Sequence, residues 1–396
     1  MPNAVIVDAV RTGMGRGKKD SGKLSHWHPV DLASEVLKAL VERNNLDPAL
    51  VDDVIMGCVM QVGEQGVNVG RNAVLAAGFP ESVPATSVDR QCGSSQQSAH
   101  FAAQGVISGA YDVVIAAGVE VMSRVPMGAS MAGGGFGMPF GPRVGARYAE
   151  RGGLVPQGIS AELIADKWNI SREELDAFSV ESHKRAARAR EQGRYQNEII
   201  PVKVKDASGN DTDEVFDYDE GVRPDSTVEK LGGLKPAFKP DGKVTAGNSS
   251  QITDGAAGLL IMSEEKANEL GLTPRARFHT FALAGVDPVM MLTGPIPSTQ
   301  KALDRSGLSI GDIDLFEVNE AFASVVLAWA KEYNPDMEKV NANGGAIALG
   351  HPLGCSGARL MTTLLNELER TGGRYGLQTM CEGGGMANAT IIERLG

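Results

Sequence analysis

Four short segments of the chain carry residue types that can do nucleophilic chemistry. They are Gln91-Cys92-Gly93, Val318-Asn319-Glu320-Ala321-Phe322, Gly350-His351-Pro352-Leu353-Gly354 and Cys381-Glu382-Gly383-Gly384-Gly385. A cysteine attacks as its thiolate, so it needs a base within hydrogen-bond reach. His351, held between glycines and followed by Pro352, is the best placed of the six histidines for that task. Two thiols, one imidazole and glycine-lined loops fit acyl transfer through a thioester better than hydrolysis or redox chemistry.

The segment before Cys92 is extended, and the chain continues from it directly as a helix. Apolar residues follow the i, i+3, i+4, i+7, i+8 spacing of one helical face: Ala99, Ala102, Ala103, Val106 and Ile107. Gly109 ends the pattern. Because free N–H groups and the helix dipole stabilise a thiolate at a helix N-terminus, we expect the pKa of Cys92 to be lowered. For a lone cysteine, a buried and inert thiol is the alternative.

The other candidate residues also have simpler structural interpretations. His351 alone could be a hydrogen-bonded histidine of a turn, and Asn319 could cap a helix that runs from Ala321 to Trp329. Cys381 offers a second acid or base. The N–H groups of the three glycines after Glu382 can hold an oxyanion.

Composition narrows the class of protein. The chain has 396 residues, of which 42% are hydrophobic and 22% charged, with a net charge of −11. An acidic balance argues against a nucleic-acid binder, and no apolar run approaches the roughly 20 residues of a membrane span. The first residues lack the pattern of a secretion signal and the last ones lack a peroxisomal address, so a cytoplasmic location is expected.

Cysteine usage excludes two further classes. The four cysteines are Cys58, Cys92, Cys355 and Cys381, with no C-x-x-C pair and no histidine cluster beside them. This spacing argues against a structural zinc site and against a disulfide framework, so we expect no metal.

The elements that must position these segments form two similar halves. An apolar run from Val113 to Ala117 is typical of a strand covered on both faces of an α/β protein. Gly93 lies forty residues after Asp53, and Gly354 lies forty residues after Asp314, which suggests a duplicated α/β unit. Between the halves, residues 126 to 145 predict a long loop, and Ser171-x-x-Glu174 predicts a capping box that opens a helix.

The four segments together resemble the motifs of the thiolase family: the nucleophilic cysteine before its helix, the N-E-A-F box, the G-H-P box and the C-x-G-G-G box. Their order and spacing match over essentially the whole chain. The resemblance implies an α/β thiolase fold of two similar halves, each with a mixed five-stranded sheet, in a five-layered core with an inserted loop domain. The corresponding boundaries are residues 1–121 with 250–273 for the N-terminal half, 122–249 for the loop domain and 274–396 for the C-terminal half.

The resemblance also implies a role for each site residue. Cys92 would take the acyl group, His351 would activate it, and Cys381 would exchange the proton on C2 of acetyl-CoA. The N–H groups of Cys92 and Gly383 would form one oxyanion hole, and His351 with a water held by Asn319 the other. Arg223 and Ser250 match positions that contact coenzyme A, which is a substrate and not a permanent cofactor. Acyl-CoA substrates and a homotetramer or homodimer are implied, with neither nucleic acid nor membrane as partner.

Two departures from the family pattern bear on the substrate. Thiolases that build acetoacetyl-CoA usually carry a His-Met pair near the acyl pocket, where this chain reads Val155-Pro156-Gln157-Gly158-Ile159-Ser160. This segment resembles the degradative branch, which accepts longer 3-oxoacyl chains, and Pro156 and Gln157 would be part of an opened pocket. Glu382 replaces a small or apolar residue, and we expect its side chain to point away from Cys381, since an inward charge would raise the thiol pKa. The sequence of the chain, especially residues 322–354, resembles those of actinobacterial thiolases, some of which cleave steroid side chains.

We therefore expect CoA-dependent cleavage of 3-oxoacyl-CoA to acetyl-CoA and a shortened acyl-CoA, in fatty-acid or steroid side-chain breakdown. The alternatives are a biosynthetic acetyl-CoA acetyltransferase and a non-catalytic thiolase-like protein that binds acyl-CoA or lipid. A ketoacyl synthase would carry a second histidine in place of Cys381. A nicotinamide dehydrogenase would carry G-x-G-x-x-G after its first strand.

Overall fold

The computed structural model describes residues 2–131 and 137–396. The strands are β1 (Ala4–Thr12), β2 (Gly15–Arg16), β3 (Asp53–Gly57), β4 (Ala85–Val88), β5 (Val113–Val121), β6 (Ile199–Ile200), β7 (Val202–Lys205), β8 (Asp211–Phe216), β9 (Thr253–Ser263), β10 (Ala276–Gly285), β11 (Leu315–Val318), β12 (Tyr375–Glu382) and β13 (Met386–Arg394). The helices are α1 (Pro29–Arg43), α2 (Val69–Ala76), α3 (Ser94–Ser108), α4 (Pro142–Tyr148), α5 (Gln157–Lys167), α6 (Arg172–Glu191), α7 (Val228–Gly232), α8 (Glu264–Glu269), α9 (Pro295–Ser306), α10 (Ala323–Tyr333), α11 (Ala346–Leu349) and α12 (Ser356–Thr371).

The strands of the two halves join into one mixed sheet with the order β11-β12-β13-β10-β1-β9-β5-β3-β4. In the first half β3 runs parallel to β4 and β5, and β9 runs antiparallel to both β5 and β1. The second half repeats this pattern with β11, β12, β13 and β10. An isolated parallel bridge between Phe316 and Val340 occupies the place of β4. The expected pair of sheets is present, and short antiparallel pairing of β1 with β10 connects the two edge to edge.

The duplicated unit is confirmed, with a register one residue different from the sequence-based alignment. Asp52 accepts hydrogen bonds from the N–H groups of Asp112 and Val113, as Asp314 does from those of Arg374 and Tyr375. Asp314 therefore corresponds to Asp52, not to Asp53. The same offset relates the first residues of α3 and α12, so Cys92 corresponds to Gly354.

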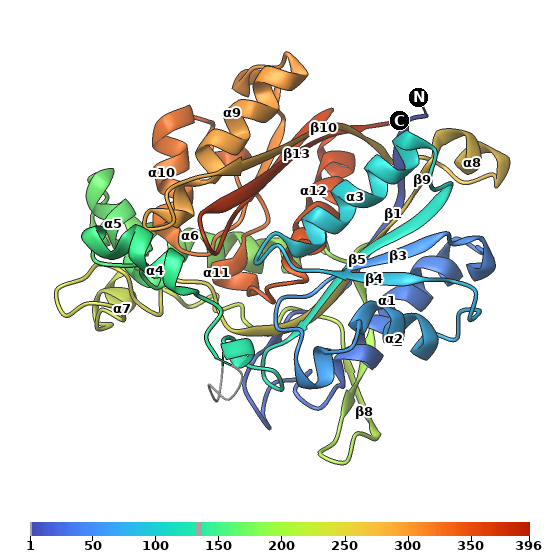
Figure 1. Cartoon of the computed structure of the whole chain (residues 1–396), viewed down its shortest axis with the longest axis horizontal. Helices are drawn as coiled ribbons and strands as arrows, with labels where there is room; N and C mark the ends of the chain where they lie inside the picture. The colour runs from blue at the N-terminus through green and yellow to red at the C-terminus, as the bar shows by residue number, and fades with distance from the viewer. Residues whose placement is uncertain (1, 132–136) are drawn as a thin grey trace.

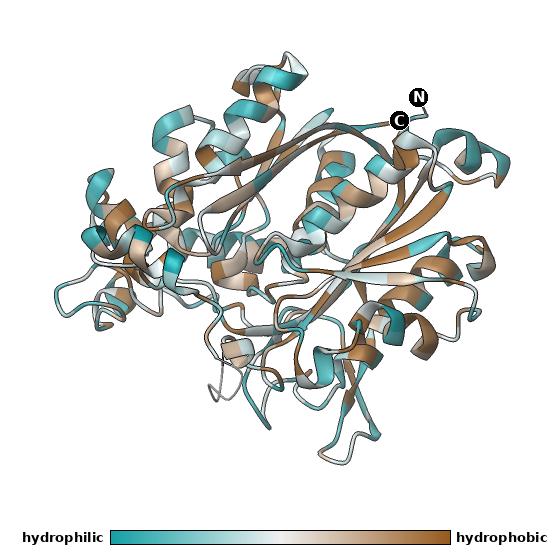
Figure 2. Ribbon diagram, viewed as in Figure 1, coloured by the Kyte–Doolittle hydropathy of each residue, from teal (hydrophilic) through white to brown (hydrophobic). Residues whose placement is uncertain are grey.

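Side chains alternate across the strands and build the layers, as a period of two requires. On β5, Val113, Ile115 and Ala117 pack in a core cluster with residues of α1, whereas Val114 and Ala116 pack with residues of α3 and α12. Residues of α9 and α10 pack on the outer face of the second half. Helices α3 and α12 thus form a central layer between the two halves, with α1 and α2 on one outside and α9 and α10 on the other (Figure 1). In Figure 2 the strands between these helices are mostly brown, and teal residues lie on the outer helices.

The segment from 122 to 249 leaves the first half after β5 and returns before β9. Its helices α5 and α6 pack against α10 and α11 of the second half, and β6 pairs with β1. The predicted capping box is present, since Ser171 and Glu174 bond reciprocally at the start of α6. The predicted loop of residues 126–145 includes the start of α4, and its residues 132–136 lie outside the described part of the chain. No helix in the described ranges is long and apolar enough to cross a membrane.

Candidate active site

A tight turn between β4 and α3 presents Cys92. Gln91 adopts a left-handed backbone conformation with φ of 49°, and the N–H groups of Gly93 and Ser94 donate to the carbonyls of Arg90 and Gln91. The Ser94 hydroxyl donates to the Gln91 carbonyl and accepts from the Arg90 N–H. The helix predicted after Cys92 is confirmed as α3, with Gly109 as its left-handed C-cap. Cys92 is therefore held at the N-terminal end of a central helix.

The environment of Cys92 corrects the expected direction of its pKa. Cys92 is buried among apolar side chains, in a cluster with Val59, Met60, Met122, Val125, Leu353 and Met380. Burial, and then the nearby Glu382 carboxyl, raise the pKa of Cys92 to about 12, against hydrogen bonds from the Gln157 side chain and from backbone N–H groups, which favour the thiolate. Desolvation outweighs the helix N-terminus at this site. The resting thiol is protonated and needs a base.

The second thiol and the glycine segment reach the same place from β12. Burial raises the pKa of the Cys381 thiol well above its usual value, and the next contributions come from Cys92 and Glu382. The Gly383 N–H is among the groups near the Cys92 sulfur that lower its pKa. The fold thus brings Cys92, Cys381 and Gly383 together, with Gln157 from α5 beside them. Sequence reasoning connected Gln157 only with the shape of the acyl pocket, because nothing local indicated that this side chain lies beside Cys92.

Hydrogen bonds on both sides of the His351 ring fix its tautomer. The Ser356 hydroxyl donates to the Pro352 carbonyl at 2.8 Å and lies 2.5 Å from His351 Nδ1. Since that hydroxyl has one proton, it accepts from Nδ1–H, which leaves Nε2 unprotonated. Asn319 Nδ2 lies 3.4 Å from Nε2. Burial and the positive charge of Arg359 lower the pKa of His351 to about 3, so the imidazole rests neutral with Nε2 available as a base.

Asn319 and Ser250 lie on neighbouring segments beside these loops. The Asn319 N–H donates to the Thr379 carbonyl on β12, two residues before Cys381. Asn319 does not cap α10, whose N-cap is Phe322. The Ser250 N–H donates to the Ala321 carbonyl, which binds the segment before β9 to the N-E-A-F box.

Arg223 lies on the surface of the inserted segment. Its side chain is exposed, and its N–H donates to His183 Nδ1. Gly221, two residues earlier, receives a hydrogen bond from the Gln251 side chain, and the Gln251 carbonyl accepts from the His351 N–H. Gln251 therefore links the segment of Arg223 to the loop of His351 through these two hydrogen bonds.

Glu382 points inward, contrary to expectation. Its side chain is fully buried, and a Cβ atom added to Gly93 would lie 2.0 Å from its Oε1. Neither carboxyl oxygen has a hydrogen-bond partner among the described residues. Burial raises the pKa of Glu382 to about 8, against the opposing charge of Arg90. The strand places alternate side chains on opposite faces, so Glu382 packs under the turn of Cys92 instead of facing solvent.

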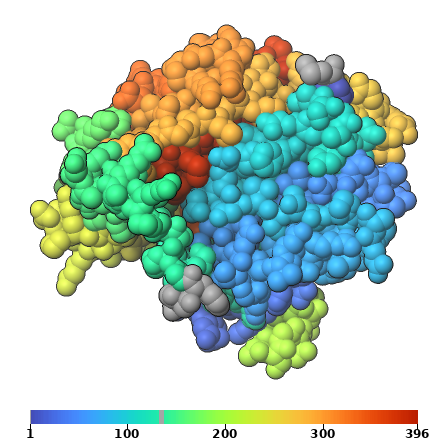
Figure 3. Space-filling model, in the orientation of Figure 1, coloured from blue at the N-terminus to red at the C-terminus, as the bar shows by residue number. Residues whose placement is uncertain are grey.

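Three parts of the chain meet at one face of the molecule. In Figure 3 a small red area from the last part of the chain lies between the green of the inserted segment and the cyan and blue of the first half. The last part of the chain supplies Cys381 and Gly383, the inserted segment supplies Gln157, and the first half supplies Cys92. The site is therefore composite, and neither half alone contains it.

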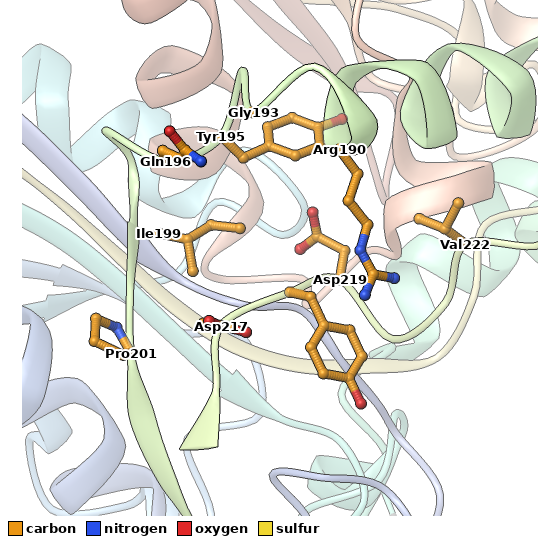
Figure 4. Close-up of a pocket in the computed structure, with 10 residues that line it drawn as sticks. Arg190, Gly193, Tyr195, Gln196, Ile199, Pro201, Asp217, Asp219 and Val222 are labelled. Atoms are coloured by element: carbon orange, nitrogen blue, oxygen red, sulfur yellow. The ribbon is translucent and has the colours of Figure 1, made fainter.

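A separate cavity of about 320 Å³ lies away from these residues. Arg190, Tyr195, Asp217, Asp219 and Val222 are among the side chains around it (Figure 4). The Arg190 guanidinium lies over the Tyr218 ring, and Asp219 is paired with the buried Arg11. None of the four chemical segments contributes to this cavity. In the described ranges, no group of three or more His, Cys, Asp and Glu side chains is arranged to hold a metal ion.

Comparisons with known proteins cover the whole chain. Two family models match, described as the thiolase N-terminal domain at residues 4–265 and the thiolase C-terminal domain at residues 272–394. The steroid 3-ketoacyl-CoA thiolase FadA6 of Mycobacterium tuberculosis is 51% identical, over 100% of this chain and 95% of its own length. A 3-ketoacyl-CoA thiolase of Aliivibrio salmonicida is 48% identical over the full length of both. The crystal structure of the Bacillus anthracis acetyl-CoA acetyltransferase superposes with a TM-score of 0.90 at 41% identity, covering 100% of this chain and 99% of the other.

Proposed function

The chain belongs to the thiolase family and is an acyltransferase with 3-ketoacyl-CoA thiolase activity, and from this premise we propose how its residues share the reaction. The observation that carries the proposal is the shared environment of Cys92, Cys381 and the Gly383 N–H. A nucleophile, a second acid or base and an oxyanion donor lie in one buried place. Cleavage of a carbon–carbon bond next to a thioester requires these three groups together.

In the first half-reaction Cys92 attacks the C3 carbonyl of the 3-oxoacyl-CoA. His351 Nε2 takes the thiol proton, and the sulfur forms a bond to C3. The C2–C3 bond then breaks, and its electron pair becomes the enolate of acetyl-CoA. Cys381 donates the proton that C2 takes up, which leaves acyl-Cys92 and free acetyl-CoA.

In the second half-reaction the thiol of a new CoA molecule attacks the acyl group on Cys92. Cys381, left as a thiolate by the first half-reaction, takes the proton of the CoA thiol, and the sulfur of CoA forms the new thioester. The bond from carbon to the Cys92 sulfur breaks, the protonated His351 returns its proton to Cys92, and the shortened acyl-CoA leaves. The N–H groups of Cys92 and Gly383 stabilise the tetrahedral oxyanion. His351 and a water held by Asn319 stabilise the enolate oxygen. Each such donor contributes roughly 3 kcal/mol to the transition state.

Coenzyme A binding is assigned to Arg223 of the inserted segment and to Ser250, the first residue after that segment. The exposed guanidinium of Arg223 suits the phosphate groups of CoA, and the Ser250 N–H binds the Ala321 carbonyl of the N-E-A-F box, beside the segment that carries Asn319. We assign residues 122–249 to this loop domain, residues 1–121 and 250–273 to the N-terminal half, and residues 274–396 to the C-terminal half. We further propose that the enzyme forms a homotetramer or a homodimer and acts in the cytoplasm.

The substrate class follows from Gln157. This side chain lies near the Cys92 thiol, where it favours the thiolate, and it comes from the first turn of α5, at the place where a His-Met pair is expected in an enzyme that forms acetoacetyl-CoA. Three methionines, Met60, Met122 and Met380, pack around Cys92, and this flexible residue adapts to the shape of its neighbours. We assign the enzyme to degradation of long or bulky 3-oxoacyl-CoA substrates. The similarity to a steroid 3-ketoacyl-CoA thiolase supports this assignment.

The test compares kcat/KM for CoA-dependent thiolysis of acetoacetyl-CoA and of a bulky 3-oxoacyl-CoA. The expected result is a preference for the bulky substrate, with no turnover of either by Cys92→Ala. A preference for acetoacetyl-CoA would favour the biosynthetic branch. Activity that persists in Cys92→Ala would contradict the assignment of the nucleophile.

A further inference from the structure

A buried glutamate in each half of the molecule contacts the catalytic loop of the other half. Glu120 lies near the end of β5 and Glu382 at the end of β12, and the offset that relates Ser94 to Ser356 also relates these two residues. Glu120 of the first half binds Gly354, in the loop of His351. Glu382 of the second half packs against Gly93, in the turn of Cys92. The two glutamates occupy equivalent positions of the duplicated unit.

The carboxyl oxygens of Glu120 accept several hydrogen bonds, whereas those of Glu382 accept none from the described residues. Glu120 Oε2 accepts from the N–H groups of Val59 and Gly354, each at 2.9 Å. Its Oε1 accepts from the Met60 N–H at 3.1 Å and from Gln65 Nε2 at 2.8 Å. Glu382 has no such partner among the described residues.

Each of these four partners of Glu120 is a donor, and the Cys58 thiol, whose sulfur lies 4.0 Å from Oε1, is a fifth and more distant donor. The orientation of the Gln65 amide is fixed, since its Oε1 accepts from the Val121 N–H. An ionised carboxylate accepts all four bonds, whereas a protonated carboxyl would direct one proton at an N–H group. Burial raises the pKa of Glu120, and the hydrogen bonds oppose that rise. In the described part of the chain no lysine, arginine or histidine forms an ion pair with Glu120. The N–H groups are what stabilise its charge.

These bonds hold two loops that meet at Cys92. Val59 and Met60 come from the loop after β3, Leu353 comes from the loop of His351, and all three pack in the apolar cluster of Cys92. The backbones approach closely, since a Cβ atom on Gly354 would lie 2.6 Å from the Cα of Cys58 and 2.8 Å from Glu120 Oε2. A carboxylate that binds both loops fixes the position of one relative to the other.

We propose that Glu120 is a positioning residue of the thiolase reaction, whose carboxylate fastens the loop of His351 to the pocket of Cys92. Glu120 touches neither the thiol nor the imidazole. It acts through Gly354, three residues after His351, and through Val59 and Met60. The inference deepens the proposed function, because it concerns the same nucleophile and base.

The test is Glu120→Gln, which has the same shape. Its amide nitrogen would replace an oxygen that accepts two N–H bonds, so donor would face donor and the loops would separate. The expected result is a fall in kcat of about 10- to 100-fold, the effect of a misplacement near 1 Å. KM for CoA is expected to stay within about 2-fold, because Arg223 and Ser250 are untouched. The rate of Cys92 alkylation by iodoacetamide at pH 7 is expected to fall together with kcat, because His351 no longer takes its proton.

A matched control lies at the other end of the same strands. Asp52 accepts hydrogen bonds from the N–H groups of Asp112 and Val113, so Asp52→Asn removes backbone acceptors without touching the catalytic loops. This variant is expected to lose thermal stability while keeping kcat and the alkylation rate. A folded Glu120→Gln enzyme with kcat within 2-fold of the parent would overturn the proposal. An equal loss of kcat in Asp52→Asn at equal loss of thermal stability would also overturn it.

A milder variant serves if Glu120→Gln does not fold. Gln65→Met removes one donor to Glu120 and leaves the three backbone donors in place. Its expected loss of kcat is about 3- to 10-fold, and an unchanged kcat would count against the proposal.

The alkylation rate also separates this inference from the proposed function. A parent enzyme that cleaves no 3-oxoacyl-CoA would refute the function, whereas the effect of Glu120→Gln on Cys92 alkylation would still decide the role of the carboxylate.

Discussion

Replacing the buried Glu382 by glutamine is expected to stabilise the protein, and to do so only at higher pH. Both oxygens of Glu382 lack partners among the described residues, and the pKa rises from the ordinary 4.5 to about 8. A carboxyl group with a raised pKa binds its proton more tightly in the folded chain than in the unfolded one. Between pH 4.5 and 8 the folded state therefore loses stability as pH rises.

The size of the effect follows from the shift. One pKa unit corresponds to 1.36 kcal/mol. Glu382 therefore lowers the free energy of unfolding by about 3 kcal/mol at pH 7 and by about 5 kcal/mol above pH 8, relative to a group with no shift. Glu382→Gln removes the titration and keeps the shape. The variant should unfold at a higher urea concentration than the parent, by a margin that grows from pH 5 to pH 8.

The assay is urea unfolding of both proteins at pH 5 and at pH 8. The difference at pH 5 reports the exchange of a neutral acid for an amide, and the further difference at pH 8 reports the charge. Glu317→Gln is the contrasting variant, since the pKa of Glu317 is also about 8 but its carboxyl lies 3.8 Å from Arg359 Nη1. The raised pKa of Glu317 acts in the same direction as that of Glu382, so the stability difference between Glu317→Gln and the parent should also shift in favour of the variant from pH 5 to pH 8. Loss of the carboxyl beside the buried Arg359 should make Glu317→Gln less stable than Glu382→Gln at both pH values. Parallel pH dependence in the parent and Glu382→Gln would refute the reasoning.

Three further predictions concern the turn of Cys92 and its base. Gly93→Ala should lower the free energy of unfolding by about 1 to 3 kcal/mol, because its Cβ would lie 2.0 Å from Glu382 Oε1; the exposed Gly141→Ala, whose Cβ meets open space, should change thermal unfolding little. The rate of Cys92 alkylation should rise steadily from pH 7 to pH 9, since the pKa is about 12, and a plateau near neutral pH would contradict this. Ser356→Ala removes the acceptor of His351 Nδ1–H and should lower kcat about 10-fold without changing KM, which steady-state kinetics would detect.

Local patterns in the sequence were sufficient to locate the chemistry. The helix after Cys92, the buried strand at Val113 to Ala117 and the capping box of Ser171 depend on residues close together in the chain, and the structure contains all three. The duplicated unit was also visible, although its register was one residue wrong, because forty-residue spacings do not show which residues pair across strands. The partners Ser356 and Gln157 were not recognisable as such, since each acts through a contact that only folding creates.

The sequence by itself determined which side chains can react and the order in which they occur. The tertiary structure decided their protonation and their positions. The sequence predicted a lowered pKa for Cys92 from its helix, but burial by Met122, Leu353 and Met380, together with the charge of Glu382, raises it. Two glutamates at equivalent positions differ in their hydrogen bonding, because four N–H donors and the Cys58 thiol surround Glu120, whereas no donor bonds Glu382 in the described chain. The free energy of a charge depends on what packs around it, and those neighbours come from distant parts of the sequence.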